Sequence, residues 1–581
     1  MVQVRFSEPT KLAKDNVQWH EFLSLESPHP YGVLPSGNAL VNNSTTTTSR
    51  NNPKQAFVRQ LRDETWLSIL GFCNGYSLSR LVQSCRYFYV AGHQPELWRD
   101  LVLYQLHASQ SHLSRDVMGD SWKDCFIRLQ HQGKQRHSIP HKPLKISGFY
   151  SDDLYRLHSC RAFCIPPAWL EEHAPLDNPQ HWTSKGLVPC IAAATMTSEK
   201  FITEFEQPNQ PVVIKGAATS WKACKDWKDP QYMRQQTQGR TFRATSGAAP
   251  LPANFTLDAF QQYCSQPILE EAPLYLFDRE ALQPHSPLHD DFYPDLQRTC
   301  PYLDPAPTLL DTDDKVGHDL FQVLGEGKRP DHTWAILGGS HSGSVFHIDP
   351  NATHAWNAAI CGRKRWIFYP PSITPPGIHP SADGDEVALP LSIGEWILTF
   401  WRDHQERKKN APPHERPLEC TAHPGDVVFV PHGWWHMVIN LDQVNIAITH
   451  NYVSRSNLGN LLRFLRQKEE QISGCRDRAE SIKPEQLHNV FLTALQQQFG
   501  TDAPWLVAAQ QQAESHWTCK AWKDDDDNNN NNKQSRKRPL EDTGASGVKT
   551  TTSVMAKAKT STNVEQSTTV ASNAPFSFSF L

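Results

Sequence analysis

The sequence lacks the features that mark several common classes of protein. Among its 581 residues, no apolar run is long enough to span a bilayer, and the N-terminal segment has no apolar stretch typical of a signal peptide. Its 13 cysteines include no C-x-x-C pair, which argues against zinc-ribbon and redox motifs. The net charge of −4 gives no support for nucleic-acid or membrane binding. We therefore expect an intracellular protein with reduced thiols, long enough for more than one domain.

Both ends of the chain are poor in the apolar residues that a core requires. Residues 1–52 include the polar run NNSTTTTSR, and residues 524–581 include Asp, Asn and Ser/Thr runs. We predict that both segments are disordered. The C-terminal tail also contains the basic cluster KQSRKRP at 533–539, which is typical of nuclear import, so we expect the protein in the nucleus.

Between these ends, the segment SVFHIDPNATHAWNAAICGRKRWIF carries side chains suited to metal binding. If it forms a β-strand, His347 and Asp349 point to one face and Ile348 to the opposite, packed face. His436, in VFVPHGWWHMVINL, is a third candidate ligand. Two histidines and one carboxylate that leave other positions open form the arrangement of non-haem Fe(II) oxygenases. Taken alone, the His-x-Asp triplet favours an ordinary surface strand with two polar residues.

A second feature of this segment suits the co-substrate 2-oxoglutarate, whose distal carboxylate needs a cation. Strand alternation places Lys364 on the same face as Trp366 and Phe368. A lysine on an inward face costs free energy unless an anion pairs with it. The same alternation places Asn440 on the face of His436. We therefore predict that Lys364 binds the distal carboxylate of 2-oxoglutarate.

These motifs resemble a JmjC domain. HIDP, AWNA, GRKRWIFYP, GDVVFVPHGWWHMVINL and IAITHNY, with PVVIKGA and APLYLFD upstream, are similar to the bifunctional arginine demethylase and lysyl-hydroxylase branch, the phosphatidylserine receptor branch. The resemblance covers about residues 188–453. It implies a double-stranded β-helix, also called a cupin or jelly roll, within a chain of mixed α and β structure.

Carried over residue by residue, the resemblance implies a set of site residues. The implied Fe(II) ligands are His347, Asp349 and His436. The implied contacts to 2-oxoglutarate are Lys364, Asn357, Tyr275 and Thr449. Ser344 stands where a close relative has threonine and keeps the hydroxyl, and with Asn440 it completes the expected cofactor-binding group. The implied reaction is hydroxylation of an arginine or lysine side chain, which becomes demethylation when an N-methyl carbon is hydroxylated and leaves as formaldehyde.

Upstream of this region, residues 56–104 contain apolar side chains at helical spacing, beginning with Trp66, Ile69 and Leu70. Together with the closing Glu-Leu-Trp at 96–98, the pattern resembles an F-box, although Arg62 stands where F-boxes usually have proline. This resemblance implies a Skp1-type adaptor and a cullin ubiquitin ligase as partners. The alternative is a helical bundle that serves only for packing.

The remaining chain divides where its composition changes. We predict a connector at 105–186, the oxygenase domain at 187–454, and helices at 455–523. An insertion at 370–423 interrupts the barrel. The insertion has four acidic side chains: Asp383, Asp385, Glu386 and Glu395. These side chains either attract a cationic substrate or belong to an ordinary solvated loop.

The sequence thus predicts an Fe(II)- and 2-oxoglutarate-dependent dioxygenase that hydroxylates or demethylates arginine or lysine in nuclear proteins such as histones. An F-box would link this enzyme to a Skp1/cullin ubiquitin ligase. One alternative is a ubiquitin-ligase substrate receptor that uses the barrel only for binding, against which the complete ligand set and Lys364 argue. The other is an RNA-directed JmjC hydroxylase, against which the near-neutral charge argues weakly.

Overall fold

The computed structural model describes residues 61–130 and 186–514, except for 62, 109–121, 239, 247–248, 266–271, 285, 304–318, 382–383, 385–386, 391 and 476–480. The predictions for 1–52, for most of the 105–186 connector and for 524–581 lie outside the described residues. None of the helices within these ranges combines the length and apolar character needed to cross a membrane.

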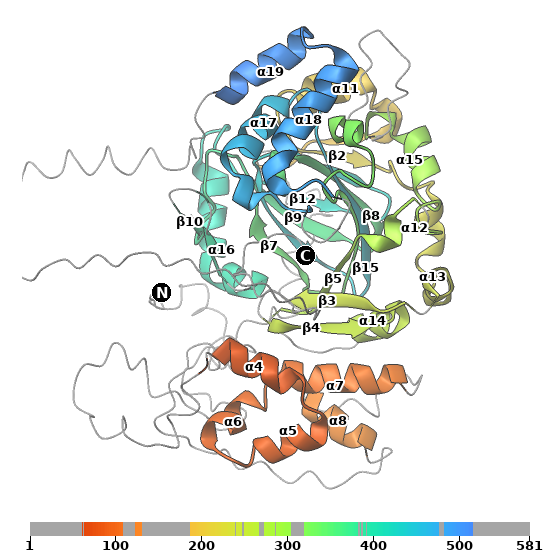
Figure 1. Ribbon diagram of the computed structural model, residues 1–581, viewed down its shortest axis with the longest axis vertical. Coiled ribbons are helices and arrows are strands. Elements are labelled where there is room, and N and C mark those ends of the chain that lie inside the picture. Colours follow the sequence, from red (N-terminus) through yellow and green to blue (C-terminus); the bar gives the residue numbers. More distant parts are fainter. Residues whose placement is uncertain are drawn as a thin grey trace, which may run out of the picture.

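Two β-sheets face each other and enclose the interior of a barrel (Figure 1). The large sheet has nine strands, which in spatial order are β1 (Cys190–Ala192), β2 (Val212–Lys215), β13 (Val427–Val430), β8 (His354–Cys361), β15 (Asn445–Tyr452), β6 (Thr333–Gly338), β5 (Tyr275–Asp278), β3 (Phe242–Ser246) and β4 (Ala249–Phe255). The small sheet consists of β12 (Leu418–Ala422), β9 (Lys364–Tyr369), β14 (Trp435–Asn440) and β7 (Gly343–His347).

The chain alternates between the two sheets as it runs from β6 to β9 and again from β12 to β15. The strand pairs are antiparallel, except for the parallel pair β1 and β2. Segments that are close in sequence therefore face each other across the interior. This arrangement is the double-stranded β-helix that the sequence predicted, and its strands supply side chains to the interior from both sides.

Strand β9 shows how alternation builds the two faces of the small sheet. Trp366 and Phe368 pack in the barrel interior. Ile367 and Tyr369 pack on the opposite face, against residues of the helix α16 (Ile393–Asn410). The predicted insertion therefore contains a helix that covers the outer face of the small sheet, preceded by the short pair β10 (His379–Pro380) and β11 (Val387–Ala388).

The charged residues of this insertion have ordinary structural roles where the structure describes them. Glu395 lies in the first turn of α16, where Ser392 caps the helix by accepting a hydrogen bond from the Glu395 amide. The basic residues 407–409 occupy the last turn, where cations are favourable. Asp383, Asp385 and Glu386 lie outside the described residues, so their predicted role in substrate attraction stays a prediction.

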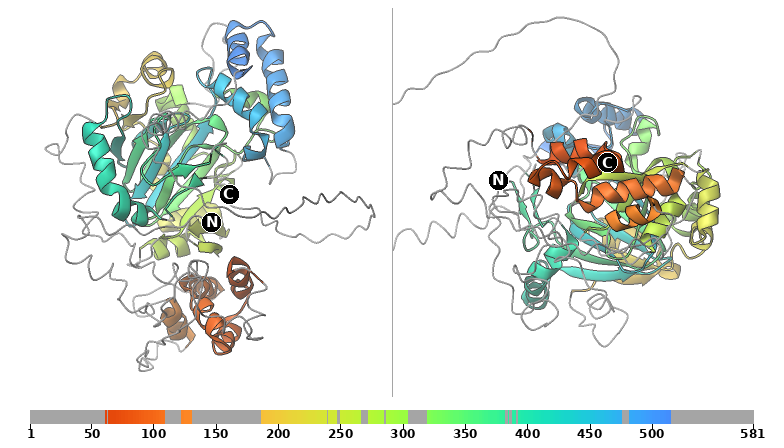
Figure 2. Two further views of the ribbon diagram at one scale, coloured as in Figure 1. Left: turned by 90° about the vertical axis from the view of Figure 1, so that its left-hand side faces the viewer. Right: turned by 90° about the horizontal axis from the view of Figure 1, so that it is seen from below.

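Among the described residues, five helices precede the barrel: α4 (Asp63–Gly71), α5 (Gly75–Leu81), α6 (Arg86–Ala91), α7 (Pro95–Ala108) and α8 (Trp122–Gln130). They lie at one end of the barrel beside β3 and β4 (Figure 2). Trp122 stacks on Tyr263 of α14 (Leu257–Cys264), so the helices share a hydrophobic core with the barrel. As the helical spacing predicted, Trp66 and Leu70 are buried, but Ile69 is exposed, contrary to its assignment to the packed face.

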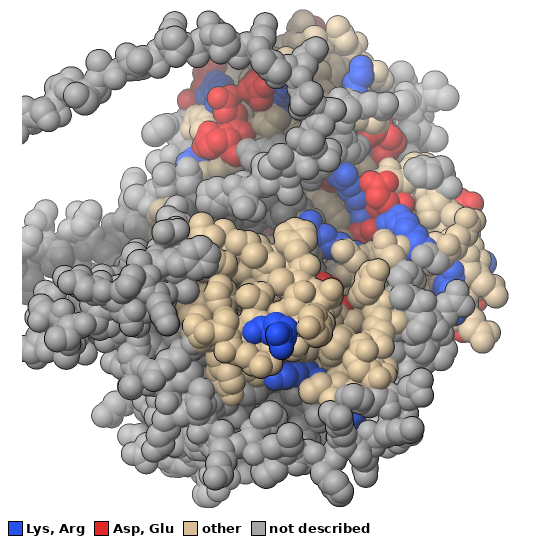
Figure 3. All heavy atoms as spheres, turned by 60° about the horizontal axis from the view of Figure 1, so that its bottom comes forward, with Lys and Arg blue, Asp and Glu red and all other residues tan. Residues whose placement is uncertain are grey.

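The exposed side of these helices has large apolar side chains. Phe72 is 93% exposed and Tyr76 is 74% exposed, and both lie at the junction between α4 and α5. Figure 3 shows this end of the molecule, where uncharged side chains form a broad area around a few Lys and Arg side chains. Residues of this kind are unusual on a surface that only faces water, because their burial is favourable.

In the part of the chain up to residue 514 that the structure describes, three α-helices follow the barrel: α17 (Leu458–Gln467), α18 (Pro484–Phe499) and α19 (Pro504–Glu514). They form a hydrophobic cluster with the segment Leu320–Leu324 and with Ala352. Shorter helices pack around the large sheet: α11 (Ser198–Phe201) with the π-helical turn Ile202–Glu206, α12 (Lys222–Asp226), α13 (Pro230–Thr237) and α15 (Tyr293–Thr299).

Candidate metal and co-substrate site

The two candidate histidine ligands lie directly opposite each other on neighbouring antiparallel strands. His347, at the end of β7, is the cross-strand partner of His436 on β14, and their ring centroids are 4.1 Å apart. The Nδ1 atom of His347 lies 2.8 Å from the Val345 carbonyl oxygen, and that of His436 lies 3.1 Å from the Trp434 carbonyl oxygen. If each Nδ1–H donates to its carbonyl, each ring presents the lone pair of Nε2 to the interior.

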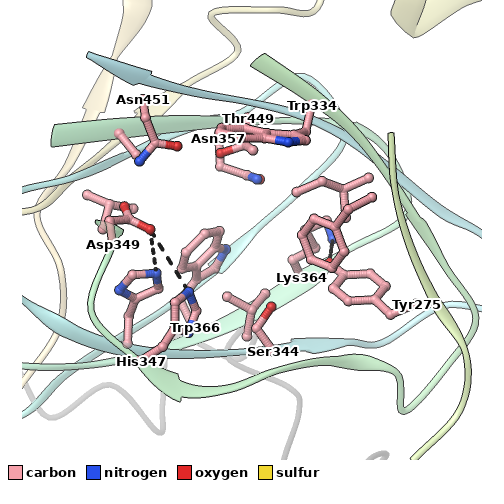
Figure 4. A pocket seen from close by; sticks show the side chains of 16 residues that line it. Tyr275, Trp334, Ser344, His347, Asp349, Asn357, Lys364, Trp366, Thr449 and Asn451 are labelled. Atoms are coloured by element: carbon pink, nitrogen blue, oxygen red, sulfur yellow. Dashed lines mark hydrogen bonds and ion pairs between the residues drawn. The ribbon is translucent and has the colours of Figure 1, made fainter. Parts of the chain in front are cut away.

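The third candidate ligand, Asp349, completes the cluster from outside the strand (Figure 4). Its Oδ1 atom lies 3.7 Å from His436 Nε2 and 4.0 Å from His347 Nε2. One ligand atom from each of the three residues lies within 4.8 Å of the others. The strand ends at His347, so the expectation that Ile348 packs on the opposite face of the same strand was wrong, and Ile348 is 37% exposed.

The protonation of these groups matches the requirements of metal ligands. Burial lowers the pKa of His347 and of His436 to about 4, so both rings are neutral at neutral pH. Burial raises the pKa of Asp349 to about 6, and its Oδ2 atom is buried without a hydrogen-bond partner among the described residues. A divalent cation would compensate this buried carboxylate. Two imidazoles and one carboxylate on one side of a common point fit Fe(II) with open positions for other ligands.

Lys364 lies deeper in the same pocket, at the start of β9, and is 1% exposed. Its Nζ atom is 3.0 Å from the Tyr275 hydroxyl and 2.8 Å from Asn440 Oδ1. Both partners are uncharged, and no carboxylate of the described residues forms an ion pair with it. Burial therefore lowers the pKa of Lys364 to about 7. Within the described ranges this lysine has no anionic partner, and a carboxylate bound here would supply one.

A chain of hydrogen bonds fixes the orientation of the Asn440 amide. Asn440 Nδ2 donates to Ser342 Oγ at 2.8 Å, and Ser342 Oγ donates to the Gly339 carbonyl at 2.6 Å. The amide oxygen of Asn440 therefore faces Lys364, its cross-strand partner. Asn440 lies behind Lys364. The sequence predicted Asn440 as part of the co-substrate site, and we assign it the role of supporting Lys364 there.

The remaining predicted contacts come from the large sheet and from β7. Asn357 on β8 and Thr449 on β15 are cross-strand partners, after a register shift between Ile446 and Ala447. Asn357 Oδ1 is buried without a partner among the described residues, and the Thr449 hydroxyl donates to the Trp356 carbonyl at 3.1 Å. The structure thus brings eight of the predicted residues to one pocket: Tyr275, Ser344, His347, Asp349, Asn357, Lys364, His436 and Thr449.

Other residues line this pocket that the sequence did not single out. They are Phe277, Trp334, Ile336, Ala355, Val430 and Asn451. Strand alternation could have identified Asn451, because it follows Thr449 by two positions on β15. Strand alternation could not have identified Trp334, because its place opposite Thr449 depends on the pairing of β6 with β15 across more than a hundred residues of chain.

Comparisons with known proteins agree with this geometry. The family profile described as "Cupin-like domain" matches residues 198–457. The chain is 36% identical over 472 residues to "Arginine-specific demethylase JMJ22" of Arabidopsis thaliana, a match that covers 81% of each protein. It is 30% identical over 265 residues to "Bifunctional arginine demethylase and lysyl-hydroxylase psr-1" of Caenorhabditis elegans, covering 45% of this chain and 60% of the relative. It is 35% identical over 151 residues to human "2-oxoglutarate and iron-dependent oxygenase JMJD4", covering 25% of this chain and 34% of the relative.

The chain belongs to the JmjC family of 2-oxoglutarate- and iron-dependent oxygenases. The predicted cupin fold, enzyme class and cofactors are confirmed by this membership. As a JmjC oxygenase, the chain has candidates for both parts of the required site in one pocket. The candidate metal ligands are His347, Asp349 and His436, and the candidate co-substrate part is centred on Lys364 and Tyr275.

Proposed function

We propose that this JmjC oxygenase hydroxylates or demethylates arginine or lysine side chains of nuclear proteins such as histones. The observation that carries the oxygenase role is the convergence of His347, Asp349 and His436 beside the buried Lys364 in one pocket. The choice of arginine or lysine is supported by the names of the Arabidopsis and Caenorhabditis relatives. The 81% coverage of the Arabidopsis relative extends this support beyond the barrel.

Each group in the pocket has a role in the reaction. When bound, Fe(II) and 2-oxoglutarate supply the oxidative decarboxylation that transfers one oxygen atom of O2 to a C–H bond. His347, Asp349 and His436 would hold the metal, with both imidazoles oriented by backbone carbonyls. Lys364 and the Tyr275 hydroxyl would hold the distal carboxylate by charge-assisted hydrogen bonds.

Part of the pocket wall around these groups is apolar. Trp366, Val438 and Ile336 line it and are buried, whereas Ser344, Asn357 and Thr449 supply polar groups. A dry site strengthens the electrostatic interactions of the bound groups and protects the reactive oxidant from side reactions. The fate of the product depends on the carbon that is hydroxylated, since a C-hydroxyl persists and an N-hydroxymethyl group leaves as formaldehyde.

Mass spectrometry of peptides tests this function. The purified protein, Fe(II) and 2-oxoglutarate are incubated with histone peptides that contain methyl-arginine, methyl-lysine or unmodified lysine. Loss of a methyl group with release of formaldehyde indicates demethylation, and a gain of one oxygen atom indicates stable hydroxylation. The His436→Ala variant is the control for activity that does not depend on the metal site. No change in any peptide, together with succinate production from 2-oxoglutarate that requires an added RNA, would favour the RNA-directed alternative.

We further propose that the helices α4–α7 bind a Skp1-type adaptor and thereby a cullin ubiquitin ligase. The observation that favours this second function is the pair of exposed aromatic side chains Phe72 and Tyr76, because adaptor grooves hold helices through apolar anchors. Arg62, the departure from the F-box pattern, lies outside the described residues.

A binding experiment with surface variants tests the adaptor proposal. Leu70 is 1% exposed, so its substitution would disturb the fold and would not report on binding. Phe72→Asp and Tyr76→Asp change exposed positions and should abolish capture of a purified Skp1-type protein. Gln486→Asp, on the exposed side of α18, is the charge-matched control and should bind like the parent. Undiminished capture by both aromatic variants would exclude this role.

Nuclear location is a proposal that rests on the basic cluster at 533–539. Replacement of Arg536, Lys537 and Arg538 by alanine in a fluorescently tagged protein should shift it to the cytoplasm. A variant that stays nuclear would remove this cluster as the import signal.

A further inference from the structure

The loop that carries Asp349 has an unusual backbone conformation. The two residues that follow Pro350, Asn351 and Ala352, have φ angles of +56° and +54°. Residues with a side chain rarely adopt this left-handed region, and asparagine tolerates it better than alanine. Two consecutive non-glycine residues in this region persist only when surrounding contacts hold them. The loop begins directly after the metal-ligand segment, so its conformation determines where the Asp349 carboxylate lies.

The contacts that hold this loop come from the chain segment that follows the barrel. Asn351 Nδ2 donates to the Ser473 carbonyl at 3.1 Å, and the Ser473 amide donates to Asn351 Oδ1 at 3.0 Å. The side-chain amide of Asn351 thus pairs with both backbone groups of one residue, 122 positions away in the sequence. Asn351 is buried, so loss of this pair would leave buried polar groups without partners.

A second buried asparagine supports the next residue of the loop. Asn457, immediately before α17, donates from Nδ2 to the Ala352 carbonyl at 3.0 Å. Its own Oδ1 accepts the Ser454 amide at 2.9 Å, which fixes the orientation of the side chain. The Ala352 side chain packs in the hydrophobic cluster of the C-terminal helices. Three groups therefore hold the loop: the Asn351 amide, the Ala352 carbonyl and the Ala352 side chain. All three contact the part of the chain that follows the barrel.

We propose that residues 454–475 complete the metal site, and that Asn351 and Asn457 are the positioning residues through which they hold Asp349. This inference rests on the role of Asp349 as a metal ligand. Residues that orient metal ligands without touching the metal typically change metal affinity by about 10–100-fold when they are lost. Residues 454–475 thus affect the metal site without lining it, because they fix the position of the Asp349 carboxylate before a metal binds.

Substitutions at Asn351 separate the backbone effect from the side-chain effect. Asn351→Gly keeps access to the left-handed conformation and removes the pair with Ser473. Asn351→Asp can still accept the Ser473 amide but cannot donate to the carbonyl, so it should rescue part of the effect. Gln238→Gly is the matched control, because Gln238 has φ +50° at the exposed end of α13, in a segment that contributes no residue to the pocket.

Titration of each protein with Mn(II), without oxygen, measures the metal affinity, and thermal unfolding in a chelator measures the fold. We expect Asn351→Gly to bind Mn(II) about 10–100-fold more weakly. Asn351→Asp should be intermediate and Gln238→Gly unchanged. The absorption spectrum of bound Co(II), which reports ligand geometry, should differ from that of the parent most in Asn351→Gly and not in Gln238→Gly. We expect this spectral difference whether or not the unfolding temperature of Asn351→Gly is lowered.

Two other outcomes are distinguishable. Parental Mn(II) affinity and Co(II) spectrum in Asn351→Gly, with loss of Mn(II) binding in His436→Ala, would overturn the positioning role and leave the metal site intact. Parental Mn(II) affinity in His436→Ala would overturn the metal site itself. A loss of Mn(II) affinity in Gln238→Gly as large as that in Asn351→Gly would show that the effect is general destabilisation, which also overturns the positioning role.

Discussion

His347 and His436 are direct cross-strand partners, and this one pairing assembles two thirds of the metal site from residues that are far apart in the sequence. The register then shifts between His436 and Val438, which pairs with Ser344. Such a bulge re-aims side chains relative to a regular ladder. Gly343 accommodates this irregularity, because a Cβ atom there would collide with the Val438 carbonyl. The strands β7 and β14 therefore approach each other closely where the pocket is formed.

Removal of the Lys364 side chain should weaken 2-oxoglutarate binding and leave metal binding unchanged. Hydrogen bonds to a charged group contribute about 1.5–3 kcal/mol, so Lys364→Ala should raise the 2-oxoglutarate requirement by roughly ten- to a hundred-fold or more. Lys364→Arg should also be impaired, because the planar guanidinium needs a different geometry between Tyr275 and Asn440. Succinate production against 2-oxoglutarate concentration measures both effects. A parental dependence in Lys364→Ala would show that the co-substrate assignment is wrong.

The affinity for 2-oxoglutarate should depend on pH because of the same lysine. With a folded-state pKa of about 7, Lys364 is charged below that pH and mostly neutral above it until a carboxylate binds. Binding above pH 7 then requires uptake of one proton, so the affinity should fall by up to about tenfold per pH unit above 7 and level off below it. Calorimetry of 2-oxoglutarate binding to the Mn(II)-loaded protein in buffers of different ionisation enthalpy detects this proton. Affinity that stays constant between about pH 6 and 9 would contradict a neutral Lys364.

The same pKa shift affects the stability of the protein without co-substrate. The folded value lies below that of the unfolded lysine, so the unfolded chain binds more protons between about pH 7 and 10.5. The contribution of Lys364 therefore destabilises the fold most at and below pH 7. This destabilisation disappears as the pH rises toward the pKa of the lysine in the unfolded chain. Lys364→Met removes this contribution, so its stability relative to the parent should be greatest at neutral pH. Chemical denaturation at two pH values measures this difference, and an equal difference at both would contradict it.

A methyl group at Gly338 should disturb the co-substrate site specifically. A Cβ atom there would lie 2.6 Å from Tyr275 Cδ2 and 2.7 Å from Asn440 Nδ2, and it would also meet Ser342 Oγ. Gly338→Ala therefore displaces both partners of Lys364, and we expect a rise of roughly tenfold or more in the 2-oxoglutarate requirement. Gly339→Ala is the neighbouring control, since the three atoms nearest to its Cβ atom belong to Cys264 and lie at 3.2 Å or more. An equal effect of the two variants would contradict the specific role of Gly338.

The outer face of the small sheet offers a test of stability. Glu419 on β12 is fully buried and is paired with Arg365, with His404 Nε2 at 2.8 Å and with Lys408 Nζ at 2.9 Å. Arg365 would be left as a buried charge in Glu419→Ala, so the free energy of unfolding should fall by about 3–5 kcal/mol. Glu406→Ala, at an exposed ion pair of α16, should change it by less than about 1 kcal/mol. Denaturant unfolding measures the free energy of unfolding of both variants. Similar losses of this free energy would show that the buried ion pair contributes no more than the exposed one.

The sequence predicted those parts of the site that depend on local periodicity. Lys364, Trp366 and Phe368 share the inward face of β9 because side chains alternate along a strand, and Asn440 shares the face of His436 for the same reason. The family motifs supplied the other predicted residues that line the pocket. Alternation failed at Ile348, because the strand ends one residue earlier and no local pattern marked that end.

The features that the sequence did not predict depend on contacts between distant segments. The pair of Asn351 with Ser473 joins two loops that have no periodic pattern. Likewise, the burial of Glu419 depends on α16 covering a sheet face that is continuous only after the strands have paired. Hydrophobic spacing identified the helices before the barrel, but it did not separate the buried Leu70 from the exposed Ile69 next to it. These distinctions arise from tertiary packing, which single-sequence periodicity does not contain.

We propose that His347, Asp349 and His436 bind one metal ion, and direct titration with Mn(II) tests this proposal. We compare the parent with His347→Ala, Asp349→Ala, His436→Ala and the exposed-histidine control His379→Ala. We expect one site in the parent and in His379→Ala, and losses of affinity in the other three that exceed the roughly 100-fold expected of residues outside the coordination shell. Parental Mn(II) affinity in any of these three folded variants would contradict it.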